Sequence, residues 1–147
     1  MDYDTRGTKV MVVEHDRTIL ELIELRLSVA GFDTCMARTG QSAIETLRNF
    51  RPSVLILDLQ LPDMSGLDVL QALNPRPGPG MVPTLVIAKQ LNPTDLQTAL
   101  RFGARDCLTK PFSGADILVR VSRLLKPPVP AAPRPPAPAA AYQVMHV

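Results

Sequence analysis

Residues 54–66 read VLILDLQLPDMSG, and this stretch decides the fold. Four apolar residues run without a break into Asp58, as expected of a strand that is buried on both faces of a parallel sheet. Pro62 and Gly66 then break the pattern and predict a turn. A carboxylate that ends such a strand lies at the carboxyl edge of the sheet, where open α/β folds bind their ligands. Asp58 is therefore the first candidate functional residue.

Apolar runs and helical patterns alternate along the rest of the chain. Residues 9–13 and 83–88 are further strand candidates, and residues 33–37 and 106–109 are weaker ones. Apolar residues at helical spacing follow each of these four segments and the strand that ends at Asp58. In chain order they are Ile19, Leu22, Ile23, Leu27 and Ala30; Ala43, Ile44, Leu47 and Phe50; Leu67, Leu70 and Leu73; Leu96, Ala99 and Leu100; and Ile117, Leu118, Val121, Leu124 and Leu125. Five alternations of strand and helix predict an α/β fold with a parallel sheet covered on both faces.

Several residues mark the ends of the expected helices. Gly31 stands where a C-terminal cap of the first helix belongs. Thr94 or Asp95 is expected to start the fourth helix. Ser113 and Asp116 have the spacing of a capping box before the fifth.

Length, charge and cysteine content limit the possible function classes. The 147 residues suffice for one domain, and 16 Lys+Arg against 14 Asp+Glu give no electrostatic case for wholesale nucleic-acid binding. Cys35 and Cys107 lack metal-ligand spacing and form a poor disulfide framework, which favours a reducing cytosol. There is no signal-peptide pattern and no apolar stretch near the ~18 residues that span a bilayer. We expect a cytoplasmic protein without membrane insertion.

Composition divides the chain into three parts. Residues 1–8 are an N-terminal extension, residues 9–126 form the expected globular domain, and residues 127–147 are a Pro/Ala-rich tail expected to be disordered. The tail ends AYQVMHV at residues 141–147. This apolar end is either disordered without function or a docking peptide that adds a strand to a partner's sheet.

Acidic residues and one lysine gather at the expected carboxyl edge of the sheet. Glu14, His15 and Asp16 follow the first strand, and Lys110 follows the last. The acids suit a magnesium ion, and the lysine ammonium can neutralise phosphoryl oxygens. In such a site Asp58 would be the nucleophile that accepts a phosphoryl group.

These motifs together resemble the receiver domains of response regulators in bacterial two-component signalling. The match covers residues 9–126 and rests on the acidic cluster after the first strand, DLQLPDMSG (58–66), GARD (103–106) and KPF (110–112). Each motif alone is weak, whereas their order and spacing together are specific. The resemblance implies a flavodoxin-like, doubly wound, five-stranded parallel sheet in the order 2-1-3-4-5 with five helices.

The resemblance also implies a role for each residue of the site. It makes Asp58 the phosphoacceptor and Lys110 the partner of the phosphoryl charge. It makes Glu14, Asp58 and the main-chain carbonyl of Gln60 ligands of Mg²⁺. It implies a cis bond between Lys110 and Pro111. The donor would be a sensor histidine kinase or a phosphotransfer protein. The chain would be a signalling domain rather than an enzyme, catalysing at most its own phosphorylation and dephosphorylation.

One departure from the family concerns the metal. His15 stands where receiver domains carry a second acid that binds magnesium directly. Imidazole is a poor magnesium ligand and a good transition-metal ligand, so we expect weakened or altered Mg²⁺ binding, with Mn²⁺ as an alternative. His15 is otherwise either an imidazolium beside Glu14 and Asp58 or a tolerated polar residue at the rim. Asp16 is one residue out of register.

Two further departures concern the switch. Ala88 replaces the Thr or Ser whose hydroxyl binds the phosphoryl group in the active state, and Cys107 replaces an aromatic residue that swings inward. Lys89 comes next and either reaches the site or stays solvated. Two functions therefore remain open. One is a phosphorylated receiver, and the other is a pseudo-receiver that acts as a constitutive protein-interaction adaptor.

The expected output is protein contact without direct binding to nucleic acid. By resemblance, it uses the face of the fourth helix, fifth strand and fifth helix. That face includes Leu96, Gln97, Arg101 and the outward residues of 116–123. An aspartate-based phosphatase is set aside because Gln60 stands where its acid-base aspartate is needed. A nucleotide-binding domain is set aside because the loop after the first strand is acidic and lacks glycine.

Overall fold

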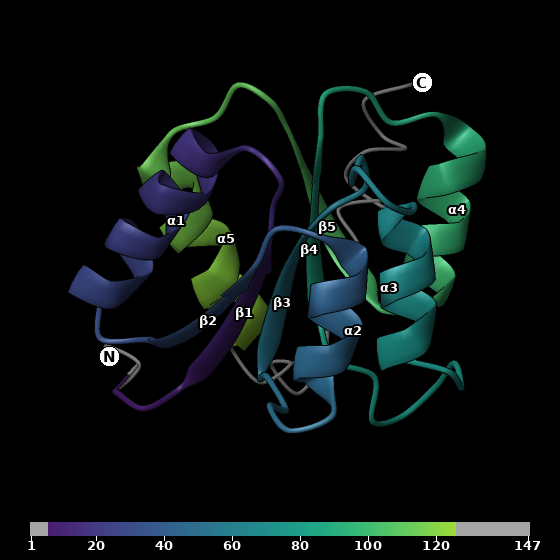
Figure 1. The fold of residues 1–147 in the computed structure, drawn as a ribbon, viewed down its shortest axis with the longest axis horizontal. Coiled ribbons are helices and arrows are strands. Elements are labelled where there is room, and N and C mark those ends of the chain that lie inside the picture. The colour runs from purple at the N-terminus through teal and green to yellow at the C-terminus, as the bar shows by residue number, and fades with distance from the viewer. Residues whose placement is uncertain (1–5, 126–147) are drawn as a thin grey trace, which may run out of the picture.

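The computed structural model describes residues 6–125, which form five strands and five helices in alternation (Figure 1). The strands are β1 (Lys9–Val13), β2 (Asp33–Ala37), β3 (Val54–Asp58), β4 (Thr84–Ala88) and β5 (Ala104–Thr109). The helices are α1 (Arg17–Val29), α2 (Gly40–Leu47), α3 (Gly66–Leu73), α4 (Pro93–Arg101) and α5 (Gly114–Leu125). The predicted alternation is confirmed. The expected tail, with its proposed docking peptide, and most of the N-terminal extension lie outside the described residues.

All five strands pair in parallel, in the order β2-β1-β3-β4-β5. The predicted flavodoxin-like topology is therefore confirmed. Strand order reverses between β1 and β3, so the residues that follow these two strands meet where open α/β sheets bind ligands. Cys35 on β2 and Cys107 on β5 are free and lie on opposite edge strands.

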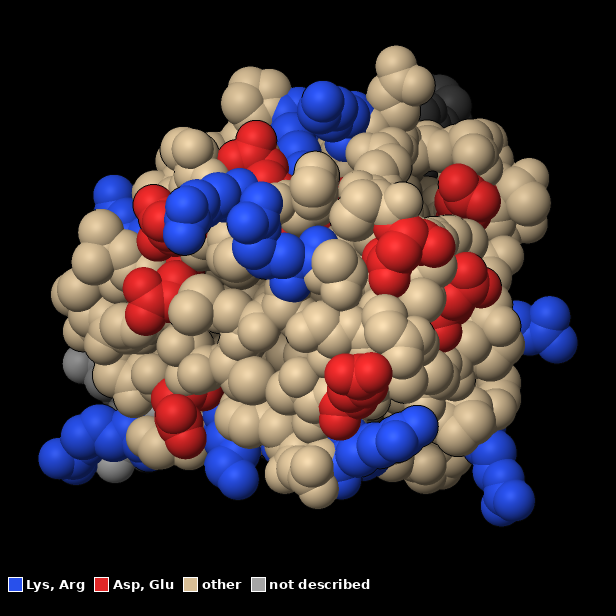
Figure 2. All heavy atoms as spheres, viewed as in Figure 1, with Lys and Arg blue, Asp and Glu red and all other residues tan. Residues whose placement is uncertain are grey.

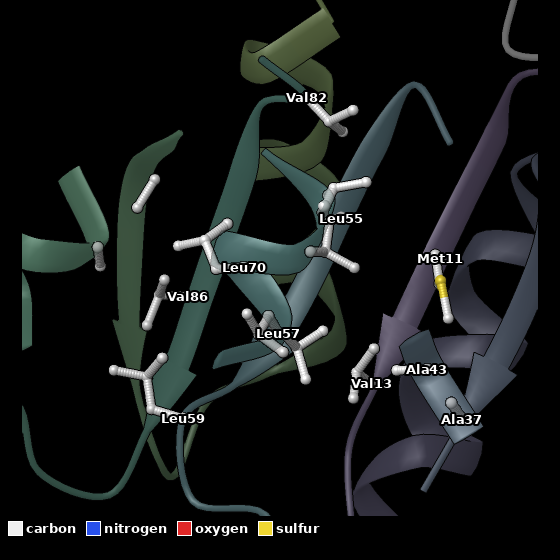
Figure 3. Packing of buried hydrophobic residues seen from close by; sticks show 14 of the residues in the cluster. Met11, Val13, Ala37, Ala43, Leu55, Leu57, Leu59, Leu70, Val82 and Val86 are labelled. Carbon is white, nitrogen blue, oxygen red and sulfur yellow. The ribbon is translucent and has the colours of Figure 1, made fainter. Parts of the chain in front are cut away.

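Helices cover both faces of the sheet, with α1 and α5 on one side and α2, α3 and α4 on the other (Figure 1). Successive residues of a strand point to opposite faces, so each central strand contributes side chains to two hydrophobic clusters, one on each face of the sheet. Figure 3 shows one of them, in which Leu57 of β3 lies near Ala43 of α2 and Leu70 of α3. Every residue of β3 is buried, which explains why its sequence is apolar up to Asp58.

Helix α1 ends as its sequence predicts. Gly31 has φ 93°, and its N–H donates to the carbonyl of Ser28 while that of Phe32 donates to Leu27, both at 3.0 Å. This is a Schellman motif, which needs a left-handed residue after the helix. The predicted buried face is wrong in one respect, because Leu20 is buried and Leu22 is only half-buried.

The predicted start of α4 is wrong, whereas that of α5 is confirmed. Asn92, not Thr94 or Asp95, caps α4, and its side-chain oxygen accepts the N–H of Asp95 at 2.7 Å. A proline fills the first helical position, where no N–H is needed. At α5, Ser113 and Asp116 exchange the two hydrogen bonds of a capping box.

Helix α3 begins directly against the end of β3. The N–H of Gly66, its first residue, donates to the carbonyl of Leu59 at 2.9 Å. A Cβ at Gly66 would lie 2.7 Å from the Cα of Leu59 and closer still to the carbonyl oxygen of Asp58. Both neighbours are backbone atoms that cannot move aside. Glycine is therefore required here, and its contact fixes the loop that follows Asp58.

We expect Gly66→Ala to lower the free energy of unfolding by about 1–3 kcal/mol, because the new methyl group forces backbone apart. Gly40→Ala is the matched control, since it also changes the first residue of a helix. The three atoms nearest to its new methyl group all belong to the flexible side chain of Met64. Urea unfolding followed by circular dichroism measures both variants. An equal or larger loss in Gly40→Ala would contradict the steric explanation.

Candidate functional site

Three predicted residues converge at the carboxyl edge of the sheet. Glu14 follows β1, Asp58 ends β3, and Lys110 follows β5. The Nζ of Lys110 donates to Oδ2 of Asp58 at 2.9 Å and lies 2.8 Å from Oε1 of Glu14. The side chains of Lys110, Asp58 and Glu14 are 9%, 3% and 0% exposed. The bond from Lys110 to Pro111 is cis, as predicted. Segments that are far apart in the sequence thus form one buried ion-pair cluster.

The carboxylate of Asp58 is held on both of its oxygens. Oδ1 accepts the main-chain N–H of Gln60 at 2.9 Å, and Oδ2 accepts Lys110. Asp58 also lines a cavity of about 360 Å³, whose other lining residues are Glu14, His15, Asp16, Ile19, Gln60, Lys89 and Lys110. The Asp58 side chain is only 3% exposed. The cavity gives a reactant a route to it.

Burial and charge act against each other in this cluster. Desolvation raises the pKa of Glu14 above its ordinary value, although the hydrogen bond to Lys110 partly lowers it. Burial alone would lower the pKa of Lys110, but its bonds to Glu14 and Asp58 outweigh this and raise it. With both acids ionised, two carboxylates share one ammonium. The cluster then has an excess negative charge that a further cation would offset.

The oxygen atoms of the site suit a hard divalent cation. Oε1 of Glu14 is buried, and the ammonium of Lys110, 2.8 Å away, is its ion-pair partner. The carboxylate of Asp58 and Gln60 line the same cavity. Within residues 6–125, no group of three His, Cys, Asp or Glu side chains could hold a metal ion. The predicted Mg²⁺ ligands, which are the carboxylates of Glu14 and Asp58 and the main-chain carbonyl of Gln60, are all oxygen donors, as this ion prefers, and they stay a prediction.

The two residues after Glu14 have different environments. His15 is exposed, and its carbonyl accepts two hydrogen bonds from Arg38 at 3.1 and 3.2 Å. Asp16 caps α1, because its Oδ1 accepts the N–H of Ile19 at 3.1 Å. This bond lowers the pKa of Asp16. Since its carboxylate is engaged at the helix, Asp16 is poorly placed to replace the missing acid.

The switch positions and one unexpected contact lie around the next strand. Ala88 ends β4 and is fully buried, and Cys107 on β5 is half-buried. Lys89 lines the cavity of Asp58. The side chain of Gln60 bridges to this loop: its Oε1 accepts the N–H of Lys89 at 3.2 Å, and its Nε2 donates to the carbonyl of Gln90 at 3.4 Å. This bridge could not be predicted from the sequence, because a single amide side chain after a strand forms no pattern that indicates its partners.

A second carboxylate anchors the loop after β3 from its other end. Oδ1 of Asp63 accepts the N–H of Gly40 at 2.8 Å, and Oδ2 accepts that of Gln41 at 2.9 Å. These are free donors at the start of α2, and their bonds lower the pKa of Asp63. The loop that carries Gln60 is thus held at Asp58, Asp63 and Gly66.

We expect Asp63→Asn to destabilise the protein at neutral pH but not in acid. A lowered carboxyl pKa contributes stability above the unfolded value, and this stability is lost as the pH falls through the folded value, below about pH 4. Urea unfolding of both proteins should therefore show a difference that shrinks toward about pH 3. Asp33→Asn, an exposed carboxylate on β2, is the control. A difference that is independent of pH would contradict the charge-assisted bonds.

The expected output face carries both apolar and charged residues. Leu100 of α4 and Val119 of α5 are 53% and 49% exposed. Arg120 pairs with Asp106 at 2.7 Å across α5 and β5. On the face drawn in Figure 2, Lys and Arg are interspersed with Asp and Glu rather than gathered in one broad basic patch. Among the described residues, no helix is long and apolar enough to cross a membrane.

Comparison with known proteins agrees with the fold. Residues 10–122 match the family model of the response regulator receiver domain. The transcriptional regulatory protein KdpE of Mycobacterium tuberculosis is 38% identical over 114 residues, which cover 78% of this chain and 49% of KdpE. The DNA-binding response regulator MtrA of the same species is 32% identical over 123 residues, which cover 84% of this chain and 53% of MtrA. The chain thus spans about half the length of these relatives. Chemotaxis protein CheY4 of Vibrio cholerae superposes with a TM-score of 0.74 at 26% identity, covering 81% of this chain and 99% of CheY4.

Proposed function

The chain belongs to the response regulator receiver domain family, and we propose that it accepts a phosphoryl group on Asp58 and signals through protein contacts. Receiver domains are signalling domains that histidine kinases phosphorylate on an aspartate. The observation that carries the proposal is the carboxylate of Asp58, held by Gln60 and Lys110 and lining an open cavity. The donor is a histidine kinase or a phosphotransfer protein. The alternative of a phosphorylation-independent adaptor has no support from the comparisons.

The chemistry assigns one task to each side chain. A carboxylate oxygen of Asp58 attacks the phosphorus of a phosphohistidine, and a P–O bond forms as the P–N bond breaks. The electrons of the broken bond remain on the imidazole nitrogen of the donor. Lys110 neutralises negative charge on the phosphoryl oxygens. A bound divalent cation would supply further positive charge there, next to Glu14 and the carbonyl of Gln60.

The proposal is tested on the whole chain with acetyl phosphate and Mg²⁺. Intact mass spectrometry should show an adduct of about 80 Da, and hydroxylamine, which cleaves acyl phosphates, should remove it. Amide signals around Asp58 should shift in the NMR spectrum when beryllofluoride, a phosphoryl mimic, is added. If neither change occurs with Mg²⁺ or Mn²⁺, the phosphoacceptor proposal fails and the adaptor alternative takes its place.

We further propose that His15 weakens the binding of Mg²⁺ by replacing a charged oxygen ligand. His15→Asp should lower the Mg²⁺ dissociation constant at least about tenfold, because the site gains a carboxylate. His15→Asn is the control, since it offers an oxygen without a charge. The wild type should also favour Mn²⁺ over Mg²⁺ more strongly than His15→Asp does. NMR titration measures both metals, and unchanged Mg²⁺ affinity in His15→Asp would overturn the assignment.

The output surface is proposed to be the face formed by α4, β5 and α5. Its support is the pair of exposed apolar residues, Leu100 and Val119, beside the ion pair of Arg120 with Asp106. MtrA is a DNA-binding response regulator about twice as long as the region it shares with this chain. For the described residues we propose contact with protein, since this surface exposes apolar side chains and its ion pair carries both signs of charge.

A further inference from the structure

Gln60 makes contacts to three separate parts of the molecule. Its main-chain N–H donates to Oδ1 of Asp58 at 2.9 Å. It also forms an isolated antiparallel bridge with Ser65, the N-cap of α3. Its side chain holds the main chain of Lys89 and Gln90 in the loop between β4 and α4. We call this side-chain contact the Gln60 clamp. One residue thus connects the proposed phosphoacceptor to the loop that leads into α4.

The clamp lies next to the position where a hydroxyl is missing. Ala88 is 0% exposed and has no polar side-chain atom that could follow a phosphoryl group. Without that hydroxyl, the loop after β4 can respond to the state of Asp58 only through another contact that depends on that state. The Gln60 clamp binds this loop at Lys89 and Gln90, the two residues that follow Ala88. It is therefore placed where such a contact is needed.

Phosphorylation of Asp58 would weaken the hydrogen bond that the main-chain N–H of Gln60 donates to it. In the free protein, Oδ1 of Asp58 carries part of the carboxylate charge, so the hydrogen bond from Gln60 is charge-assisted. In an aspartyl phosphate, the remaining carbonyl oxygen is neutral and accepts more weakly. The phosphoryl oxygens would enter the cavity that Gln60 and Lys89 both line. If the peptide group of Gln60 turns toward the phosphoryl oxygens, the side chain of Gln60 moves with it.

We infer that the side chain of Gln60 transmits the state of Asp58 to the loop between β4 and α4. This inference rests on the proposed function, because it assumes that Asp58 changes state. Gln60 acts as a positioning residue. Its main chain follows the acceptor, and its side chain moves Lys89 and Gln90. Helix α4 begins three residues after Gln90, at Pro93, after its cap Asn92. The Gln60 clamp thereby supplies a route to α4 that does not need a hydroxyl at Ala88.

The test compares the whole chain with Gln60→Met, which keeps the side-chain length and removes both hydrogen bonds of the clamp. Beryllofluoride is added to each ¹⁵N-labelled protein. We expect the shifts of amides beside Asp58, such as Leu59, to remain in Gln60→Met. We expect the shifts of α4 amides, which lie beyond the cavity, to be at least about twofold smaller. Gln90→Ala is the matched control, because only the main chain of Gln90 takes part in the clamp.

A double-mutant cycle without any ligand tests the coupling separately. Asp58→Ala should change the hydrogen-exchange rate of the Lys89 amide severalfold when Gln60 is present and leave it unchanged in Gln60→Met. Equal α4 shifts in wild type and Gln60→Met, or additive exchange rates in the cycle, would overturn the inference. If beryllofluoride fails to bind the wild type, the proposed function fails, and the cycle alone decides whether Gln60 couples Asp58 to the loop.

Discussion

Asp58→Asn is expected to abolish the phosphoryl adduct completely. Asparagine has the same shape and its amide oxygen can still accept the N–H of Gln60, but the amide is not a nucleophile toward phosphorus. Lys110 keeps Glu14 as an ionic partner, so the loop around the site should remain in place. Intact mass spectrometry after incubation with acetyl phosphate measures the loss.

Asp63→Asn is the matched control for this experiment. It makes the same chemical change in the loop that follows Asp58, but Asp63 binds the start of α2 rather than lining the cavity. Its adduct should form as in the wild type. An adduct that persists in Asp58→Asn would place the acceptor elsewhere, and peptide mapping would then locate it.

Lys110→Met is expected to slow phosphorylation by about 10²-fold, the usual cost of removing one preorganised group that stabilises transition-state charge. The ammonium lies 2.9 Å from Oδ2 of Asp58 and 2.8 Å from Oε1 of Glu14, so its loss leaves two buried carboxylates without their shared cation. Methionine keeps the length of the side chain. The rate of adduct formation with acetyl phosphate measures the effect.

Lys89→Met is the matched control for Lys110→Met. Lys89 lines the same cavity but is exposed. Gln60 binds the main-chain N–H of Lys89, which the substitution retains. We expect Lys89→Met to change the rate of adduct formation by no more than a few fold. Similar losses in both variants would mean that general positive charge in the cavity, rather than the ion pairs of Lys110, assists the transfer.

Patterns that repeat along the chain made the fold predictable. The apolar run into Asp58 and the alternation of strands and helices depend on burial, and burial leaves a periodic signature in a sequence. The gathering of Glu14, Asp58 and Lys110 was predictable because parallel strands end at one edge. The strand order came from the family resemblance and was confirmed.

Contacts made by single polar side chains were not predictable. Asn92 caps α4 although Thr94 and Asp95 are also capping residues by type, and only the path of the chain decides among them. The Gln60 clamp and the anchoring of α2 by Asp63 join residues more than twenty positions apart, with no periodicity to reveal them. Such contacts depend on the assembled fold.

The close approach of Gly66 to the end of β3 also determines where the chain tolerates insertions. Because α3 starts against the carbonyl of Asp58, the segment of residues 59–65 has a fixed length, and an added residue would displace α3. The opposite holds for residues 75–80, where a Cβ at Gly78 or Gly80 would meet nothing within 4 Å. A peptide tag or a reporter domain therefore belongs in that loop, at the amino edge of the sheet and away from the phosphoacceptor.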